Sequence, residues 1–551
     1  MVAASRIVEH QIRWDCAGEN IQELQEIFLP IPGRIRGKDI AVKDEFVFLV
    51  LDHPPRSVHG VLKRLHARIG GGHRRLNLPV SLSRSLPLIG HLHLFGRKPH
   101  LSLLTLSNKY GPIFSLRLGM VPSVVVASAH LAKELFKAQD VTFSSRPYFM
   151  PGEYSFYNFL DMGFAPYGDY WKNIRKLCAT ELFTIRRIDS FLWVRTEELH
   201  EMLSALLDSS LDCKPVNMRD MVTTCLFNVI TRILMSKRFY TFVGDEATMD
   251  DDAREFKSLL LSITDQALDF HISEFVPPWL RGIDWKIPRL KKLQAKIDSF
   301  LQKIVDEHKL GVDSGKEDFM HIMLEYLKDE PYCEDSVKAN SMELICGTDT
   351  SAAVIEWAIL ELLHHPEMLR KAQEEMDVVV GNSHLVGEAD IAQLQYMQAV
   401  IKETFRFHPP IPLLPRMASH DCKLGGFDVP KGATTFVHVY AIGRDPAVWD
   451  EPLKFMPERF LGNSLDVKGQ DYELLPFGSG RRGCPGMILG LRTVQLLVSN
   501  LIHSFDWSFA GERGGEAFPL EERDSAGTVI WTKTPLQVVA TPRLRKEVLL
   551  G

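Results

Sequence analysis

A lone cysteine lies in a glycine-rich loop near the C-terminal end of the sequence. The loop, Phe477–Gly486, contains Cys484 and leads directly into an apolar helical pattern over Met487–His503. Glycines let the backbone turn tightly and approach a large flat ligand, and Pro485 suits the first turn of a helix. A cysteine at a helix N-terminus, with the Arg481–Arg482 pair beside it, is favoured as a thiolate. The loop therefore predicts a soft anionic ligand.

Three roles are considered for Cys484. Zinc needs further Cys or His ligands at short spacing, and the residues next to Cys484 supply none. A haem iron needs one axial thiolate from the protein. A buried structural cysteine is the commonest state of a free Cys. The residues around Cys484 decide between the last two.

The loop resembles the haem-binding loop of the cytochrome P450 family of haem-thiolate monooxygenases. The family spacing Phe-x-x-Gly-x-Arg-x-Cys-x-Gly is met at Phe477, Gly480, Arg482, Cys484 and Gly486. The resemblance implies haem b as the cofactor and Cys484 as the proximal iron ligand. It also implies that Arg482 pairs with a haem propionate and that Phe477 packs beside the sulfur.

A Glu-x-x-Arg pair precedes this loop. Glu403 and Arg406 are three residues apart in a helical segment, so they share a face. Taken alone, the pair fits an ordinary surface ion pair. In the resembled family it joins the Arg of a Pro-Glu-Arg-Phe motif, here Arg459, in a buried charge triad. Such a triad requires dense hydrogen bonding to offset burial, so the resemblance implies a role in folding and haem retention.

A Gly-Thr-Asp-Thr run interrupts the helical pattern Met342–His364 at Gly347. Hydroxyl and carboxylate side chains compete for the backbone and can open a kink there. One interpretation is a capping cluster at a helix break. The family resemblance implies an oxygen-activating groove in which Asp349 and Thr350 relay protons. The stretch from Val337 to Gly347 is one residue shorter than expected for plant members. A one-residue deletion within a helix rotates the side chains before it by about 100° relative to those after it.

Three further residues are expected near the cofactor. Trp171 and Arg175 are four apart and share a helix face. An amphipathic edge would explain them, but the family pattern Trp-x-x-x-Arg places both on a haem propionate. Arg416, which follows a Pro-rich run, is a third propionate residue by the same resemblance.

Length and composition bound the fold. The chain has 551 residues, 45% of them hydrophobic, and a net charge of −6, which argues against nucleic-acid binding. Its eight cysteines lack paired spacing, so reduced thiols are expected. Helical periodicity dominates, with strands over 113–118, 123–127, 422–439 and 528–541, and helices over 218–235, 255–270, 288–308 and 391–407. We expect an α+β fold, mainly α with a smaller β region, in one large haem-binding domain.

The resemblance divides the chain into two parts. Residues 78–551 form the expected catalytic domain, and residues 1–77 form an atypical extension without a recognisable membrane anchor. A basic segment at 56–75 fits either a solvated face or contact with an anionic bilayer. The longest apolar run near the start, Phe46–Leu51, is far shorter than the roughly 18 residues that a span needs.

The leading hypothesis is a plant microsomal A-type monooxygenase that hydroxylates a hydrophobic small molecule of secondary metabolism. The family implies electrons from NADPH–cytochrome P450 reductase and a place on the cytoplasmic face of the endoplasmic reticulum membrane. Arg481 is a plausible docking charge for the reductase. A haem-thiolate isomerase or dehydratase, and a non-catalytic haem binder or defective gene product, remain as alternatives; retention of Asp349 and Thr350 disfavours the isomerase.

Overall fold

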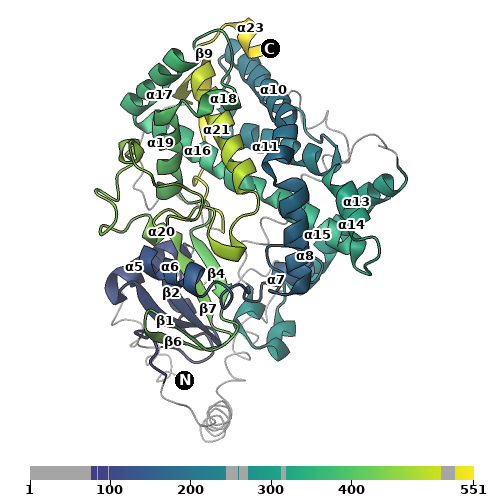
Figure 1. Ribbon diagram of the computed structural model, residues 1–551, viewed down its shortest axis with the longest axis vertical. Coiled ribbons are helices and arrows are strands. Elements are labelled where there is room, and N and C mark those ends of the chain that lie inside the picture. The colour runs from purple at the N-terminus through teal and green to yellow at the C-terminus, as the bar shows by residue number, and fades with distance from the viewer. Residues whose placement is uncertain are drawn as a thin grey trace, which may run out of the picture. The chain divides into compact units, whose positions relative to one another are not determined.

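The computed structural model describes residues 76–550 apart from 83–84, 97, 243–258, 260–270, 312–317 and 511–527. Helices make up most of this part of the chain (Figure 1). The longer ones are α5 (Pro99–Tyr110), α8 (Asp169–Leu177), α10 (Leu192–Leu211), α11 (Met218–Met235), α13 (Ile287–Lys309), α14 (Phe319–Tyr326), α15 (Cys333–Cys346), α16 (Thr348–His364), α17 (Pro366–Val379), α19 (Gln395–Phe407) and α21 (Met487–Ser504). The expected mainly α fold with a smaller β region is confirmed.

Shorter helices connect these elements. The short α-helices are α6 (Ala129–Lys133), α7 (Met150–Tyr154), α9 (Ile185–Ser190), α18 (Glu388–Ile391), α20 (Val439–Ile442) and α23 (Lys546–Leu550). The 3-10 turns used below are η5 (Ile272–Phe275), η6 (Pro278–Ile283), η7 (Pro457–Phe460) and η8 (Gly480–Arg482).

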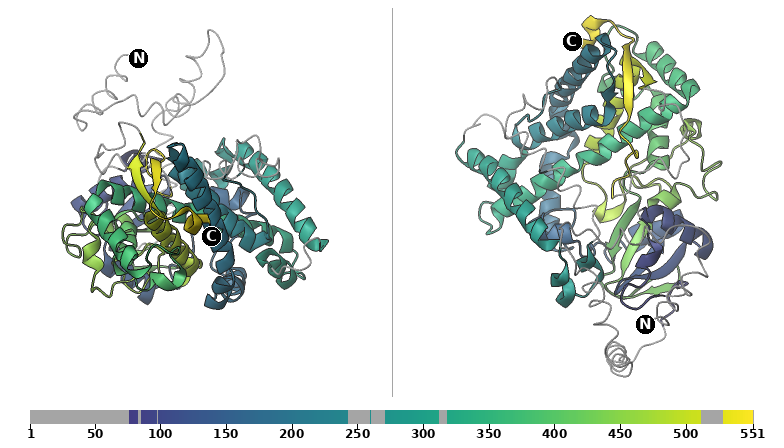
Figure 2. Two further views of the ribbon diagram at one scale, coloured as in Figure 1. Left: turned by 90° about the horizontal axis from the view of Figure 1, so that it is seen from above. Right: turned by 180° about the vertical axis from the view of Figure 1, so that it is seen from behind.

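The helical core forms around α16. From Ala352 to Ile359 every residue of this helix is buried, as expected of a helix covered on all sides by other elements. Helices α11 and α21 both pack directly on α16, and α10 packs on α11. The right view of Figure 2 shows a long helix, in the teal-green colour of α15 and α16, that runs across the described domain. The core therefore positions the start of α16 against the start of α21, where the cysteine loop ends.

The main sheet joins strands from distant parts of the chain. Its order is β1 (Ile113–Leu118), β2 (Val121–Val126), β7 (Thr434–His438) and β4 (Leu413–Met417). Strands β1 and β2 are antiparallel, whereas β2 and β7 are parallel, with Ser123 opposite Thr434. Strand β4 runs antiparallel to β7, with Arg416 opposite Thr435. The sheet thereby carries Arg416 toward the cysteine loop.

Two smaller sheets complete the β region. One contains β3 (Val216–Asn217), β9 (Gln537–Pro542) and β8 (Phe505–Phe509), in that order. The other is the hairpin of β5 (Cys422–Leu424) and β6 (Phe427–Val429), whose turn residues Gly425 and Gly426 both have positive φ. The expected strand at 113–118 is confirmed as β1, and that at 123–127 is β2, which begins two residues earlier. The strand-rich zone expected over 422–439 contains β5, β6 and β7, and its last residue, Val439, begins α20.

Three expected elements differ in extent. The strand expected over 528–541 is β9, which begins at Gln537 and extends to Pro542. The helix expected over 391–407 begins at Gln395, because Leu394 separates it from the short helix α18. The pattern from Met342 to His364 divides at Gly347 into α15 and α16. The helix expected over 255–270, the basic segment 56–75 and the extension 1–77 lie outside the described residues, apart from Leu259, Leu76 and Asn77.

Candidate active site

The cysteine loop is fixed by hydrogen bonds and by two glycines at positive φ. The Cys484 N–H donates to the carbonyl of Phe477 at 2.8 Å. Gly480 has a φ of +69°, and a Cβ there would lie 2.5 Å from Asp140 Oδ1, so this position requires glycine. The Phe477 ring packs on Phe405 with 5.2 Å between centroids. These contacts fix the conformation of the loop, and Cys484 lies three residues before the start of α21.

The pKa of Cys484 reflects opposing neighbours. Desolvation by the surrounding protein raises the pKa of its thiol to about 11, and the Gly486 N–H and Arg175 act to lower it. The Arg481–Arg482 pair does not stabilise a thiolate here, because Arg481 pairs with Asp140 at 2.6 Å and Arg482 points to backbone carbonyls. Coordination of a metal ion would replace the proton of this thiol.

Arg482 and Trp171 donate hydrogen bonds to the same backbone segment. Arg482 donates to the carbonyls of Ser144 at 2.6 Å and Met162 at 3.1 Å, and its guanidinium lies 4.3 Å from the centroid of the Trp171 ring. Trp171 Nε1 donates to the same Met162 carbonyl at 2.9 Å. The structure thus brings together residues that are more than 300 positions apart in the sequence.

Arg175 and Arg416 approach the cysteine loop from two other elements. Arg175, on α8, donates to the Gly483 carbonyl at 2.8 Å. Arg416, on β4, is buried, donates to the Pro415 carbonyl at 2.9 Å, and would lie 3.9 Å from a Cβ at Gly478. All the residues expected near the cofactor therefore converge on the loop that contains Cys484.

Arg146 joins this group although the sequence did not single it out. Its side chain donates to the carbonyls of Gly163 at 2.9 Å and Pro415 at 2.7 Å. Arg146 lies in a Ser-Arg-Pro sequence before α7 and has no spacing that relates it to the cysteine loop. Its contribution arises from tertiary contacts alone.

The four arginines form a positive cluster, defined here as Arg146, Arg175, Arg416 and Arg482, of which Arg416 and Arg482 are buried and the other two half-buried. Their hydrogen bonds named above end on neutral carbonyl oxygens. Burial lowers the pKa of Arg146 to about 10, and burial together with Arg146 lowers that of Arg482 to about 9. Burial, Arg146 and Arg482 also depress the pKa of Arg416 strongly. Glu343 and Asp161 balance part of this charge, since both act electrostatically on Arg146 and Arg482. The remaining positive charge fits a ligand with more than one carboxylate, as haem has in its two propionates.

The break between α15 and α16 is held by threonine hydroxyls. Thr350 Oγ1 donates to the Gly347 carbonyl at 2.9 Å, and Thr348 Oγ1 donates to the Ile345 carbonyl at 2.8 Å. The expected competition of hydroxyls for the backbone is confirmed. A Cβ at Gly490 of α21 would lie 3.5 Å from Ser351 Oγ and 3.8 Å from Phe477, so the Thr350 region and the cysteine loop are close neighbours. Asp349, in the first turn of α16, acts electrostatically on Cys346.

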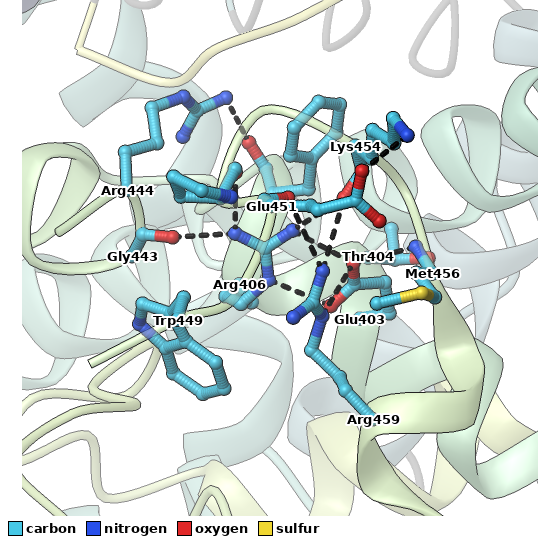
Figure 3. Close-up of polar contacts among 12 residues, drawn as sticks. Glu403, Thr404, Arg406, Gly443, Arg444, Trp449, Glu451, Lys454, Met456 and Arg459 are labelled. Carbon is cyan, nitrogen blue, oxygen red and sulfur yellow. Dashed lines mark hydrogen bonds and ion pairs between the residues drawn. The ribbon is translucent and has the colours of Figure 1, made fainter. Parts of the chain in front are cut away.

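The charge triad forms a separate buried network on α19 (Figure 3). Glu403 accepts from Arg406 at 2.7 Å through both carboxylate oxygens and from Arg459 at 3.2 Å. Arg406 also donates to the carbonyls of Gly443, Pro452 and Lys454. The side chains of Glu403 and Arg406 have no exposed area. The network thereby joins α19 to the segment 443–459, which precedes the cysteine loop.

Comparison with known proteins identifies the family. The sequence model of the cytochrome P450 family matches residues 80–538, so the chain belongs to this family. It is 40% identical over 480 residues to a flavonoid 3'-monooxygenase of Petunia hybrida, covering 84% of this chain and 92% of that protein. A flavonoid 3'-monooxygenase of Arabidopsis thaliana is 41% identical over 479 residues, covering 84% and 91%.

Solved structures agree with this result. A zebrafish cytochrome P450 solved with abiraterone has a TM-score of 0.67 and 26% sequence identity, covering 81% of this chain and all of that chain. The chain is therefore a cytochrome P450 monooxygenase, an oxidoreductase whose cofactor is haem b, and its relatives are plant enzymes of secondary metabolism.

Proposed function

We propose that this enzyme hydroxylates a hydrophobic plant secondary metabolite, using O2 and electrons from an NADPH-dependent reductase. The observation that carries the proposal is the convergence of Cys484, the arginine cluster and the hydroxyl-lined break at Gly347. The names of the Petunia and Arabidopsis relatives support a phenolic substrate of the flavonoid class. In this scheme the thiolate-ligated haem supplies the activation of dioxygen.

The protein residues hold the cofactor and orient it. Cys484 would provide the sulfur ligand, and the loop residues Phe477, Gly480 and Gly486 fix its position. The arginine cluster would hold the two propionates, with the Trp171 ring against the Arg482 guanidinium. Propionate binding would add charge-assisted hydrogen bonds to guanidinium groups that the contacts described above direct to neutral carbonyl oxygens.

Asp349 and Thr350, at the start of α16, are the residues proposed to transfer protons. The Thr350 hydroxyl is held by the Gly347 carbonyl at 2.9 Å, which leaves its oxygen free to accept a further hydrogen bond. Asp349 is partly exposed at the start of α16 and can exchange protons with water. We assign to the pair the delivery of protons during oxygen activation.

An exposed apolar patch supports attachment to a membrane surface, on the cytoplasmic face of the endoplasmic reticulum. Trp279 and Trp285, at and just after η6, are 72% and 67% exposed, and Leu88 is 59% exposed. The two segments are neighbours, because Gly119 donates to the Ile89 carbonyl and the next residue, Met120, donates to the Phe275 carbonyl. We define the membrane patch as Leu88, Trp279 and Trp285. No helix of the described ranges has the length and hydropathy needed to cross a bilayer.

The reductase would dock on the face that carries Arg481. This side chain is 47% exposed, although it pairs with Asp140.

An isomerase that needs no reductase is the second candidate, and the retained Asp349–Thr350 pair disfavours it. Oxidation that depends on NADPH and reductase supports the monooxygenase, whereas product formation from a peroxide substrate without reductase supports the isomerase.

The axial ligand is tested with purified ferric protein. Reduction with dithionite and addition of carbon monoxide should give the strongly red-shifted Soret band of thiolate-ligated haem. Absence of this band from folded, haem-containing protein would contradict the proposal.

A spin-state titration with phenylpropanoids, flavonoids, terpenoids and fatty acids then identifies the substrate class, and flavonoids are expected to give the largest change.

A further inference from the structure

Helix α13 presents a line of basic side chains to solvent at the edge of the described domain (Figure 1). Arg289, Lys292 and Lys296 are all exposed. Their spacing of three and four residues places them on one side of the helix, and the exposed Lys303 continues the same line. These four residues span roughly 21 Å along the helix axis. We define them as the basic face of α13.

The carboxylates of the same region are turned inward. Residues 287–305 include five Lys and Arg residues but one carboxylate, Asp298. Asp298 pairs with the buried Lys338 of α15 at 2.5 Å, so it lies on a different side of the helix from the basic face. Just before the helix, Asp284 is buried and accepts from the N–H and the hydroxyl of Ser273. Neither carboxylate therefore neutralises the basic face.

The positive charge of this face is also uncompensated by other elements. Within the described ranges, Arg289, Lys292 and Lys296 form no ion pair, whereas Lys309 at the end of the same helix pairs with Glu334. An ordinary solvated helix surface mixes charges of both signs. Since the whole chain has a net charge of −6, the basic face is a local concentration of charge and does not follow from a basic protein.

Exposed apolar side chains adjoin the beginning of the basic face. Trp279, Ile283 and Trp285 are all more than half exposed, and Trp285 is two residues before the start of α13. Tryptophan side chains lie at the headgroup level of a bilayer, where Lys and Arg reach the phosphates. An acidic protein would match the charge of the face, but the neighbouring tryptophans favour a lipid surface as its partner.

We propose that the basic face of α13 binds the anionic headgroups of a phospholipid bilayer, so that the enzyme selects negatively charged membranes. This inference rests on the proposed attachment through Leu88, Trp279 and Trp285, and adds the class of lipid to it. The membrane patch supplies an apolar contact that does not depend on the charge of the lipid. The basic face supplies an electrostatic contact that requires anionic lipid and weakens as salt is added.

The test compares full-length holoprotein on two kinds of vesicle by co-sedimentation. One kind is phosphatidylcholine alone, and the other is an equimolar mixture of phosphatidylcholine and phosphatidylserine. The α13 variant carries Arg289→Gln, Lys292→Gln and Lys296→Gln together. Because these side chains are exposed and unpaired, the variant should fold normally, and its carbon monoxide band verifies the fold and the axial ligand.

A matched control removes the same charge elsewhere. It carries Lys533→Gln, Arg545→Gln and Lys546→Gln, three exposed positions close to the C-terminus of the chain. Like the α13 variant, it loses one Arg and two Lys residues. The control therefore separates the local basic face from a general effect of net charge on vesicle binding.

The α13 variant should bind the mixed vesicles about thirtyfold or more weakly than the wild type, because each cation near an anionic surface contributes about a fivefold factor in affinity. The two proteins should bind phosphatidylcholine vesicles equally. Added NaCl should reduce the difference between them on the mixed vesicles. The control should bind both kinds of vesicle as the wild type does.

Acetylation of lysines followed by mass spectrometry locates the contact. Mixed vesicles should protect Lys292 and Lys296 of the wild type, whereas Lys533 and Lys546 should stay reactive. Equal reactivity of all four lysines with and without mixed vesicles would contradict a contact through α13.

The possible failures are distinguishable. Unchanged binding of the α13 variant to mixed vesicles would overturn the inference and leave an acidic protein as the partner of this face. An equal loss in the control would overturn it as well. A wild type that binds both kinds of vesicle equally would overturn the inference but retain the proposed membrane attachment, and a wild type that binds neither would contradict both.

Discussion

At the scale of single residues, the site gathers positive charge that Glu343 and Asp161 balance only in part. The surrounding protein raises the pKa of the Cys484 thiol, and the arginine cluster gathers four guanidinium groups whose hydrogen bonds end on carbonyl oxygens. Both features are costly in the haem-free chain and favourable once a metal and two propionates are present. The free energy of haem binding is thus linked to the relief of this local charge imbalance.

Substitution of Arg416 should therefore act in opposite directions on the two forms of the protein. We expect Arg416→Leu to leave the haem-free protein as stable as the wild type or more so, because a buried charge is removed. The same change should weaken haem retention by about 2 kcal/mol or more, roughly thirtyfold in affinity. Thermal unfolding of the apoprotein and the rate of haem transfer to apomyoglobin measure the two effects. Destabilised apoprotein together with unchanged haem transfer would contradict this account.

Thr350 provides a second test at the residue scale. Thr350→Ala removes the hydroxyl that bridges to the Gly347 carbonyl, so proton delivery should fail more often than substrate binding. Hydrogen peroxide released per NADPH consumed should rise several-fold, and the spin-state response to substrate should be retained. Thr350→Ser, which keeps a hydroxyl, is the matched control. Unchanged coupling in Thr350→Ala would reject the assigned role.

At the scale of elements, buried ion networks connect helices to the loops that follow them. The triad is the principal case, and its members are not equivalent. Arg406 has no exposed side-chain area and binds both oxygens of Glu403, whereas Arg459 is 7% exposed and binds one of them. Each arginine also donates to three backbone carbonyls. The network joins α19 to 443–459 and so supports the cysteine loop indirectly.

We expect Arg406→Met to destabilise the holoprotein by about 3–5 kcal/mol, since it leaves the Glu403 carboxylate buried with one partner fewer. Arg459→Met should cost clearly less. Guanidinium-induced unfolding followed by the Soret band gives both values. If the two variants lost equal stability, burial and hydrogen bonding would not explain the roles of the two arginines.

The contact between α13 and the start of α14 predicts a pH dependence. Burial opposes the charged form of His308, but hydrogen bonds to Asp318 at 2.9 Å and to the Ile304 carbonyl prevail and raise its pKa above the ordinary value. Its stabilising contribution is therefore fully present below the unfolded pKa of about 6.5 and is lost as pH rises through the higher folded pKa.

His308→Gln should remove that pH-dependent contribution. The difference in unfolding free energy between wild type and variant is expected to be larger at pH 6 than at pH 9. Amide hydrogen exchange of α13 and α14 at the two pH values localises the effect. A difference that does not change with pH would contradict the assigned charge state of His308.

At the scale of the whole molecule, the exposed membrane patch should determine how the enzyme attaches to a bilayer. Replacing Trp279 and Trp285 together by Ser should lower the affinity for anionic phospholipid vesicles about tenfold or more, because two aromatic side chains lose their burial in the interface. Trp193 on α10, which is 54% exposed, provides the control. Vesicle co-sedimentation of full-length protein measures binding. Equal losses in Trp193→Ser and the double variant would contradict a localised patch.

The sequence alone predicted the fold class from its helical periodicity, and its resemblance to the cytochrome P450 family implied the cofactor and Cys484 as the ligand. The loop Phe477–Gly486 specifies its own turns through its glycines, and the Gly-Thr-Asp-Thr run specifies a helix break through its hydroxyls. Helical periodicity likewise predicted α11, α13 and α21 nearly to their ends.

The tertiary structure alone decided which distant charges share one environment. Arg146 and the Asp161–Glu343 pair have no recognisable spacing to the cysteine loop, although an acidic residue within the apolar pattern at 342–345 was a sign that could have drawn attention to Glu343. The charge state of Cys484 also depends on everything packed around it. Burial and long-range electrostatics arise from segments that meet only on folding, so local sequence patterns carry no record of them.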